Sequence, residues 1–247
     1  MQSTREIFNN HQGNRLHKWN HYFEIYDRHF GAFVNQSPVI LEIGVSQGGS
    51  IDMWQKFFGP GLKYYGIDIN PGCKQFEKEN VTIFIGSQSD RNFLNKVKQQ
   101  IPDLDILIDD GGHTMEQQIV TFEEMFSKIK YGGVYLCEDN HTSYWPDFGG
   151  GLKRNSTYIE FIKNLIDVMH LWYAGKNNNI KHKELKDKLY SISFYDSIVV
   201  IEKEKIEPPF DIKKGDINVG YPEDNKPSFC FNLKKWYQKI RIHLKYG

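Results

Sequence analysis

Hydrophobic residues recur along the chain at two spacings, one typical of buried strands and the other typical of amphipathic helices. Short apolar runs bounded by glycine, proline or charged residues predict strands at 38–44, 63–69, 81–86, 104–110 and 132–139. Between these runs, apolar residues return every three or four positions and predict helices, for example at 18–33 and 115–126. Strands that alternate with helices connect in parallel, so the pattern predicts a doubly wound α/β sheet.

The last two predicted strands break this alternation. Residues 188–195 and 197–204 are apolar runs with almost no connection between them, which predicts an antiparallel hairpin at the edge of the sheet. A helix expected at about 157–172 precedes the hairpin. The complete pattern therefore predicts a seven-stranded, doubly wound sheet with an antiparallel ending.

The length of 247 residues fits one compact domain with appendages. We expect a helical N-terminal lid at 1–36, a central domain at 37–205, and a C-terminal extension at 206–247 that is rich in proline, glycine and charge. The extension ends in a pattern typical of a basic amphipathic helix. Such a helix would pack on the body or on another subunit, or contact an anionic membrane surface.

Charge and cysteine content narrow the classes of partner. The chain has 31 basic and 31 acidic residues, so it lacks the global field of a nucleic-acid-binding protein, and the expected partner is a small or weakly charged molecule. Three scattered cysteines, the lack of a signal-peptide pattern, and the lack of an apolar run near 20 residues favour a cytoplasmic protein.

The first predicted strand ends in a glycine-rich turn, EIGVSQGGS at 42–50. In doubly wound sheets, ligands bind at the carboxyl ends of the strands, and Gly44 allows a sharp turn beside such a ligand. Asp68 lies 24 positions later (68 − 44), near the spacing of about 20 at which an acid binds a ribose diol. Ser46 replaces the second glycine of a dinucleotide fingerprint, which favours a nucleoside without a pyrophosphate. The alternative is an ordinary glycine-rich turn.

Two neighbouring strand ends, in LIDDGGH and VYLCED, carry an acid cluster, and its members are Asp109, Asp110, Glu138 and Asp139. Such a cluster is costly unless a cation lies among its members. The last three have the spacing of an oxygen-donor site for a hard divalent metal, and His113 lies close enough in sequence to accept a proton there. Two alternatives stay open: the first two acids cap the next helix, and the last two form a solvated loop end.

These motifs resemble the class I S-adenosylmethionine-dependent methyltransferases, and more narrowly the metal-dependent sugar O-methyltransferases of the mycinamicin type and their relatives in surface-polysaccharide clusters. The resemblance covers residues 18–151 and rests on KWNHYFEIYDRHF, LEIGVSQGGSIDMW, YYGIDINPGC, IGSQSD, IDDGGH and EDNHTSYWPDFGGG. It implies the Rossmann-like fold of class I methyltransferases. It also implies that the segment containing His17, Lys18, Trp19 and Tyr22 belongs to an N-terminal lid.

The resemblance further implies a cofactor site, a metal site and a catalytic base. S-adenosylmethionine would be bound by Glu42, Gly44, Ser50, Asp68, Ile69, Ser87, Gln88 and Asp109, with Asp109 nearest the sulfonium. Mg²⁺, or Mn²⁺ in its place, would be held by Asp110, Glu138 and Asp139. Asp110 and His113 would carry the catalysis, His113 as the base. The chain departs from the family in having Ser87 where an acid is usual and Gly112 where serine is common.

The chemistry of methyl transfer agrees with this set of residues. A sugar hydroxyl is too weak an acid to ionise unaided, and a divalent cation held by carboxylates would orient a vicinal diol and lower its pKa. We therefore expect an O-methyltransferase acting on a sugar of a nucleotide sugar, a surface polysaccharide or a glycosylated natural product. The alternatives are a non-catalytic ligand-binding scaffold and a related metal-dependent hydroxylase. We expect a homo-oligomer, no nucleic-acid partner, and possible contact with the inner membrane face.

Overall fold

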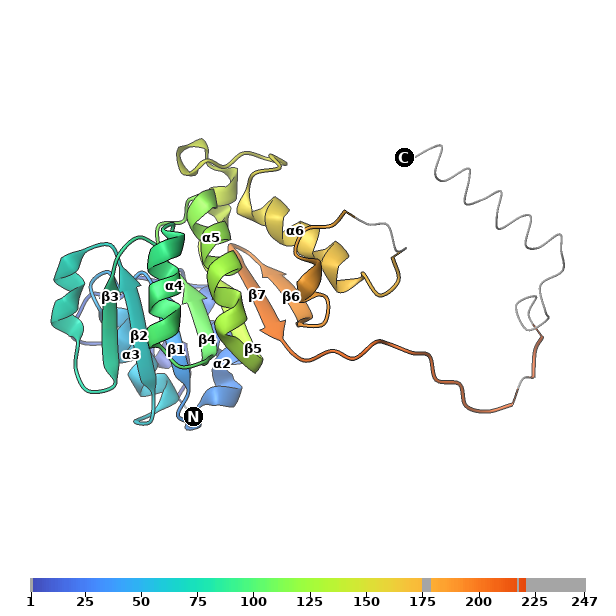
Figure 1. The fold of residues 1–247 in the computed structure, drawn as a ribbon. Coiled ribbons are helices and arrows are strands. Elements are labelled where there is room, and N and C mark those ends of the chain that lie inside the picture. The colour runs from blue at the N-terminus through green and yellow to red at the C-terminus, as the bar shows by residue number, and fades with distance from the viewer. Residues whose placement is uncertain (1, 175–178, 217, 221–247) are drawn as a thin grey trace. The chain divides into compact units, whose positions relative to one another are not determined.

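A computed structural model of the chain describes residues 2–174, 179–216 and 218–220. Residues 1–208 form one unit built on a seven-stranded sheet with the strand order β3-β2-β1-β4-β5-β7-β6 (Figure 1). The strands are β1 Val39–Ile43, β2 Lys63–Asp68, β3 Val81–Ile85, β4 Leu104–Asp109, β5 Ile129–Cys137, β6 Leu189–Tyr195 and β7 Ile198–Lys203. Strands β1 to β5 are parallel, whereas β7 is antiparallel to both of its neighbours. The predicted doubly wound sheet with a terminal hairpin is thus confirmed.

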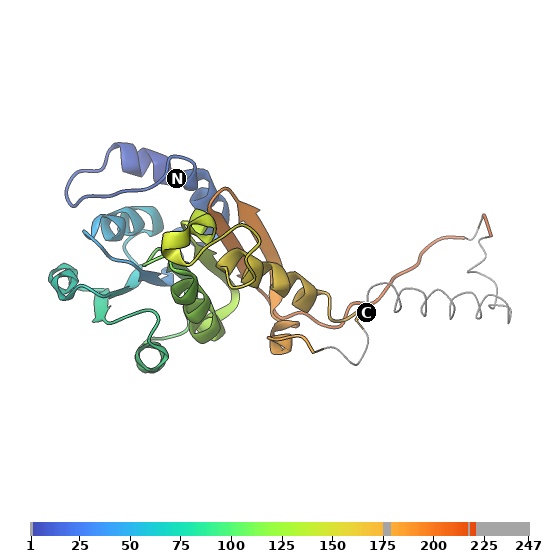
Figure 2. The same ribbon diagram turned by 90° about the horizontal axis from the view of Figure 1, so that it is seen from above.

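Helices cover both faces of the sheet (Figures 1 and 2). One face carries α1 Thr4–Asn9, α2 Tyr22–Phe30 and α3 Gly49–Phe58, and the other carries α4 Arg91–Gln100, α5 Met115–Met125 and α6 Tyr158–Met169. Short 3-10 helices span Gly31–Phe33, Pro71–Phe76, Phe126–Lys128, Asn140–Tyr144, Pro146–Phe148 and Lys183–Leu185. None of the described helices is long and apolar enough to cross a membrane.

Two hydrophobic cores, one on each face, explain why the parallel strands are continuous apolar runs. Successive strand residues point to opposite faces: Ile40 packs in the core with Trp54, and Leu41 packs in the core with Phe122. All of these side chains are at most 1% exposed. A strand buried on both faces carries apolar residues on both faces, which removes the alternation seen in half-exposed strands.

The N-terminal helices belong to the first core. Ile7 of α1 and Phe23 and Tyr26 of α2 are buried against the same cluster as residues of α3 and the sheet. Helix α1 begins at a capping box formed by Ser3 and Glu6, and its six residues are too few for a helical period to be recognised in the sequence. Helix α2 is shorter than the 18–33 pattern, because residues 11–21 form an extended, irregular segment before it.

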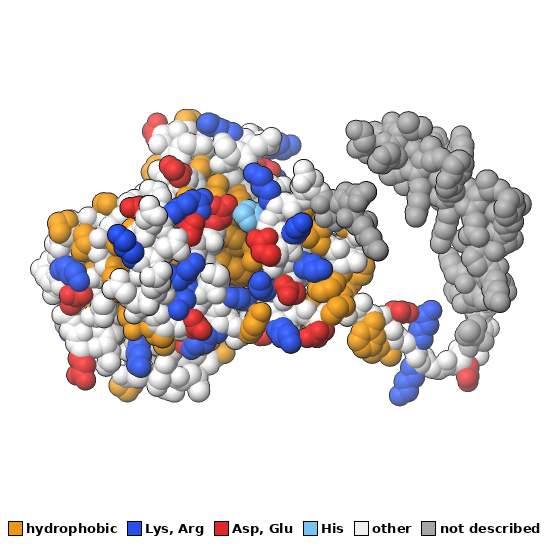
Figure 3. Space-filling model, in the orientation of Figure 1, with side chains coloured by type: hydrophobic (Ala, Val, Ile, Leu, Met, Phe, Trp, Pro, Cys, Tyr) orange, Lys and Arg blue, Asp and Glu red, His pale blue; other side chains and the backbone are white. Residues whose placement is uncertain are grey.

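Residues 209–247 form a separate unit, whose described part, 209–216 and 218–220, contains no helix or strand. The C-terminal amphipathic helix expected from the sequence lies outside the described residues. On the face of the molecule seen in Figure 3, basic and acidic side chains are interspersed, in line with the balanced composition.

Candidate cofactor and metal site

A cavity of about 640 Å³ lies at the carboxyl ends of β1, β2 and β4. Strand β1 lies between β2 and β4, so the cavity is at the point where the strand order reverses, which is the usual ligand site of a doubly wound sheet. Its volume falls in the range of small-molecule and cofactor sites. Its wall combines the turn after β1, the ends of β2 and β4, and residues 15–19 of the N-terminal segment.

The turn after β1 approaches the end of β4 so closely that only glycine fits at its start. Gly44 has a φ of +93°, and a Cβ atom placed on it would lie 2.0 Å from the carbonyl oxygen of Asp110. Gly48, with a φ of +77°, then leads directly into α3. The turn consequently exposes its backbone to the cavity, as the glycine pattern in the sequence predicts.

Asp68 is held rigidly at the edge of the cavity by backbone amides. Its two carboxylate oxygens accept hydrogen bonds from the amides of Ser46 and Asn70, both at 2.8 Å. Each oxygen retains a further lone pair, so the side chain can still accept hydrogen bonds from a hydroxyl pair in the cavity. This geometry fits the ribose of a nucleoside, and the cradle formed by Gly44 leaves room for it.

Most of the predicted cofactor residues line the cavity: Gly44, Ser50, Asp68, Ile69, Ser87 and Gln88. Glu42 and Asp109 do not line it, because strand alternation turns both side chains into the cores and leaves them fully buried. Glu42 accepts hydrogen bonds from Ser50, Trp54 and Tyr64 on the α3 side. Burial raises its pKa, although the ammonium of Lys18 opposes this. Instead of lining the cavity, these two acids support its wall from beneath.

Asp109 is linked to the cavity through Gln88. The amide of Gln88 donates to Asp109 at 2.9 Å and to Thr121 at 3.1 Å, and its oxygen accepts from the backbone amide of Gly112 at 2.7 Å. Burial raises the pKa of Asp109 to about 7, and the hydrogen bond from Gln88 opposes this rise. Gln88 therefore holds the turn after β4. The family resemblance also implies that Ser87 and Gln88 contact the adenine edge of the cofactor, and this contact stays a prediction.

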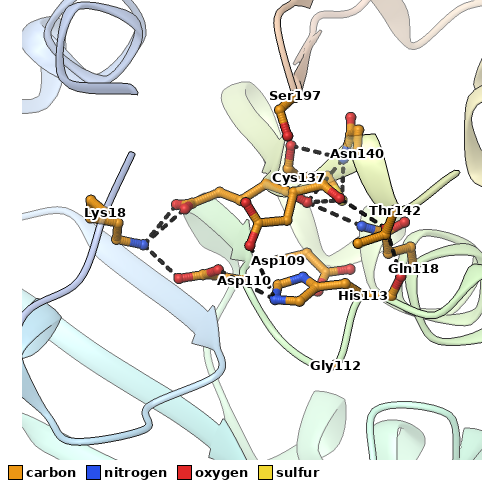
Figure 4. A network of polar contacts seen from close by, with 12 residues as sticks. Lys18, Asp109, Asp110, Gly112, His113, Gln118, Cys137, Asn140, Thr142 and Ser197 are labelled. Carbon is orange, nitrogen blue, oxygen red and sulfur yellow. Dashed lines mark hydrogen bonds and ion pairs between the residues drawn. The ribbon is translucent and has the colours of Figure 1, made fainter. Parts of the chain in front are cut away.

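Three members of the predicted metal and base set meet at the end of β4. Asp110, His113 and Asp139 each offer one ligand atom, and these atoms lie within 4.8 Å of one another. The Nε2 atom of His113 lies 3.3 Å from Oδ2 of Asp139 and 3.9 Å from Oδ1 of Asp110 (Figure 4). His113 and Asp139 both have left-handed backbones, with φ of 58° and 55°. Such strain costs roughly 1–3 kcal/mol per residue and is concentrated at functional sites.

The helix that follows does not use the acids as caps. Helix α5 is capped by Thr114, whose hydroxyl accepts from the amide of Gln117, while the side chain of Gln117 accepts from the amide of Thr114. The interpretation of Asp109 and Asp110 as helix caps is therefore wrong. Asp139 is also held, because the hydroxyl of Tyr22 donates to its Oδ1 atom at 2.7 Å.

Glu138 lines the same cavity as this trio, and its carboxylate pairs with a lysine from the N-terminal segment. The ammonium of Lys18 lies 2.9 and 3.0 Å from the two oxygens of Glu138, and 2.6 Å from Oδ2 of Asp110. The hydroxyl of Tyr26 donates to Glu138 at 2.8 Å. The sequence motif KWNHYF pointed to a lid, but the pairing of Lys18 with the acids was not foreseen. The signal for it was the acid cluster itself, which requires a cation among its members.

The ionisation of this buried group follows from its contacts. Burial lowers the pKa of Lys18, but the charges of Asp110, Glu138 and Glu42 outweigh burial and raise it above the ordinary value of a lysine. Burial and the charge of Asp110 raise the pKa of Glu138, and Lys18 opposes them. The ammonium of Lys18 is therefore retained, and it neutralises part of the cluster.

The donor set fits a hard divalent cation. The carboxylate oxygens of Asp110 and Asp139 suit Mg²⁺ or Mn²⁺ better than a soft metal, and the described cysteines Cys73 and Cys137 are outside the group. The Oδ1 atom of Asp110 and the Oδ2 atom of Asp139 have no lysine partner among the described residues. Asp110 and Asp139 thus each have an oxygen that a cation could bind as the structure stands. The oxygens of Glu138 could bind a cation only if the ammonium of Lys18 moved away from them.

Half-exposed aromatic side chains are found at Trp19, which lines the cavity, and at two residues that follow Asp139 in sequence. Trp19, Tyr144 and Trp145 are each 49% exposed. The ring of His141 lies 5.7 Å from that of Trp19 and 4.5 Å from that of Trp145, so the two tryptophans flank it. A second cavity, of about 430 Å³, is lined by His141 and Tyr144 among others. Exposed rings with polar groups between them are suited to bind a molecule that has both apolar and hydroxyl faces.

Comparison with known proteins shows which proteins the chain is similar to. No family model matches it. It is 34% identical over 188 residues to demethylmacrocin O-methyltransferase of Streptomyces fradiae, covering 72% of this chain and 47% of that protein. It is 33% identical over 188 residues to mycinamicin VI 2''-O-methyltransferase of Micromonospora griseorubida, with the same two coverages. The chain therefore spans about half the length of these curated relatives.

A solved structure is similar as well. The MycE methyltransferase of the mycinamycin biosynthetic pathway, in complex with Mg and SAH, matches with a TM-score of 0.71 and 30% sequence identity. The match covers 76% of this chain and 50% of MycE. By sequence and by fold, the chain therefore belongs to the class I S-adenosylmethionine-dependent methyltransferases and is a homologue of sugar O-methyltransferases.

Proposed function

We propose that the chain is an O-methyltransferase that uses S-adenosylmethionine and a divalent cation, Mg²⁺ or Mn²⁺, to methylate a hydroxyl of a sugar with a vicinal diol. The observation that carries the proposal is the juxtaposition of His113 with Asp110 and Asp139 at the wall of the cavity that contains Gly44 and Asp68. One site thus combines a nucleoside cradle, oxygen donors for a metal, and a base.

The chain's own residues account for most of the steps. Asp68 would bind the ribose hydroxyls, and the turn at Gly44 would accommodate the methionine part of the cofactor. Asp110 and Asp139 would hold the cation, with Glu138 as a third ligand, and the cation when bound would polarise a substrate hydroxyl. His113 Nε2 would accept the hydroxyl proton, because His113 lines the cavity and this atom lies beside Asp110 and Asp139, where the cation would hold the hydroxyl. S-adenosylmethionine supplies the electrophilic methyl group.

A sugar acceptor is supported by the relatives and by the surface beside the cavity. The relatives are named for the O-methylation of sugars on glycosylated natural products, such as a rhamnosyl group of a tetracenomycin. In this chain, the half-exposed ring of Trp19 lines the same cavity as Asp110, His113 and Asp139, and the half-exposed ring of Trp145 packs on the other tryptophan's neighbour, His141. Pyranose rings stack on such aromatic faces through their C–H groups while their hydroxyls bind polar neighbours. Nucleotide sugars, polysaccharide sugars and glycosylated natural products all offer this chemistry.

The test is a mass-spectrometric screen for a gain of one methyl group. The full chain is incubated with S-adenosylmethionine, Mg²⁺ and panels of nucleotide sugars, glycans and glycosylated natural products, with EDTA as the metal-free arm. His113→Ala and Asp110→Asn are each expected to lower the rate by about 10²–10⁴ while S-adenosylhomocysteine still binds. His170→Ala, at an exposed histidine on the end of α6, is the control. Full activity in both site variants would refute the mechanism.

The same screen separates the other functions. A non-catalytic scaffold would bind S-adenosylhomocysteine without any methyl transfer, and a hydroxylase would add oxygen in place of a methyl group. We also propose a homo-oligomer, which the exposed aromatic residues would permit, with light scattering as its test. The cytoplasmic location stays a proposal from the sequence. Contact of the C-terminal helix with the inner membrane face concerns residues outside the described part and is tested by vesicle flotation.

A further inference from the structure

Lys18 is the residue that joins the N-terminal segment to the acid cluster. It lies in the irregular segment at 11–21, between α1 and α2, and its side chain is only 2% exposed. Its ammonium contacts Asp110, which is 92 positions away in sequence, and Glu138, which is 120 positions away. Figure 4 shows this ammonium pointing at the carboxylate of Asp110. A desolvated charge in this place is stable only because the acids surround it.

The oxygens that Lys18 uses are those that a divalent cation requires. Both oxygens of Glu138 and Oδ2 of Asp110 are within 3.0 Å of the ammonium. A metal ion that takes Glu138 as a ligand needs one of the same oxygens, and two cations on one buried carboxylate repel each other strongly. The ammonium and the metal ion therefore compete for Glu138 and Asp110.

Building on the proposed metal-dependent function, we propose that Lys18 is an internal competitor of the divalent cation and that metal binding releases Lys18, with its segment, from the acid cluster. The segment is coupled to the cavity because Arg15, Lys18 and Trp19 line its wall. Two other contacts hold its ends: the backbone carbonyl of Arg15 lies against the start of α3 at Gly49, and His21 binds the carbonyl of Asp196 at 3.0 Å. Between these two points, Lys18 anchors the segment to the acids.

Displacement of Lys18 by the divalent cation has two effects. The cation gains the ligands Asp110 and Glu138, and it frees residues 16–20, between the two other contacts, to move at the mouth of the cavity. Trp19, directly after Lys18, stacks edge-on with His141 and is half exposed, so movement of Lys18 changes the surface beside the site as well. Metal affinity is set lower than the acids alone would give, because the ammonium must first be displaced.

The test is Mn²⁺ binding to the full chain, measured by electron paramagnetic resonance of free Mn²⁺, with no substrate present. Lys18→Met keeps an unbranched side chain and removes the charge, and it is expected to lower the Kd for Mn²⁺ at least tenfold. Lys18→Arg keeps the charge and is expected to bind no more tightly than the wild type. Lys78→Met makes the same charge change at an exposed lysine paired with Asp52, and is expected to leave the Kd unchanged. An unchanged or higher Kd in Lys18→Met would overturn the inference.

Amine labelling of the wild-type chain with acetic anhydride, read by mass spectrometry, gives an answer that does not depend on a variant folding. The amine of Lys18, whose side chain is 2% exposed, is expected to be acetylated faster when Mn²⁺ is added, whereas the exposed amine of Lys78 is expected to react at an unchanged rate. Unchanged or slower labelling of Lys18 while Mn²⁺ is bound would overturn the displacement of Lys18 and leave the metal site intact. If neither the wild type nor Lys18→Met binds Mn²⁺, the proposed metal dependence fails together with the inference.

Discussion

Replacing Gly44 with alanine tests how tightly the ends of β1 and β4 approach each other at the cavity. A Cβ atom at this position would lie 2.0 Å from the carbonyl oxygen and 2.7 Å from the carbonyl carbon of Asp110, both of them backbone atoms. Backbone atoms cannot move away as the end of a flexible side chain can, so the two strand ends must separate.

The structure also sets the size of the effect. A φ of +93° strains an alanine by about 1–2 kcal/mol, and the reduced freedom of the unfolded chain returns about 0.4–1 kcal/mol. Forcing the backbone apart adds about 1–3 kcal/mol, as overpacking does elsewhere. Gly149 is the matched control, since its φ is +79° but the nearest atom to an added Cβ, on Met115, is 3.7 Å away. We expect Gly44→Ala to lose about 2 kcal/mol more than Gly149→Ala.

The assay is urea unfolding of both variants, followed by circular dichroism, with calorimetry of S-adenosylhomocysteine binding at a temperature where both remain folded. Gly44→Ala is expected to bind at least tenfold more weakly, because separation of the strand ends distorts the turn that lines the cavity. Gly149→Ala is expected to bind as the wild type does. Equal losses of stability in the two variants, or wild-type affinity in Gly44→Ala, would refute the reasoning.

Two further predictions concern stability. Burial raises the pKa of Asp109 from 3.8 to about 7. The contribution of the protonated carboxyl to stability is therefore complete below about pH 4 and is lost as the pH rises through about 7. The loss amounts to about 4 kcal/mol. Asp109→Asn should therefore gain on the wild type in urea unfolding, in EDTA, as the pH rises from 4 to 8; a constant difference across this range would contradict the assignment. Thr114→Ala should lower the free energy of unfolding by about 1 kcal/mol through loss of the α5 cap, and an unchanged urea midpoint would show that Thr114 does not cap the helix.

Much of the fold could be predicted because parallel strands buried on both faces leave a strong local pattern. The runs at 38–44 and 104–110 have consecutive apolar residues, at 39–41 and 106–108, and they became β1 and β4 within a residue or two. Helix boundaries were predicted less well. Helix α1 was missed, since six residues give less than two full turns of a helical period, and its start depends on the capping contact between Ser3 and Glu6.

The residues of the candidate site could also be predicted only in part. Gly44, Asp68, Asp110 and His113 were found from the sequence because each follows a predicted strand, and parallel strands bring their carboxyl ends to one edge of the sheet. Which way a side chain points there is a separate question. Glu42 and Asp109 lie within their strands, where both faces are buried, and their side chains are beneath the cavity wall, whereas Asp110 follows the end of β4 and lines the cavity.

The sequence by itself determined the sheet, the glycine turn and the presence of an acid cluster that needs a cation, because these depend on local periodicity and on residue type. Only the tertiary structure decided which basic side chain pairs with which acid of the cluster. Lys18 reaches Asp110 and Glu138 across 92 and 120 positions, and no local pattern encodes a contact at that separation. It arises because the N-terminal helices pack into the core beside the carboxyl ends of β4 and β5, where a buried carboxylate is stable only when paired.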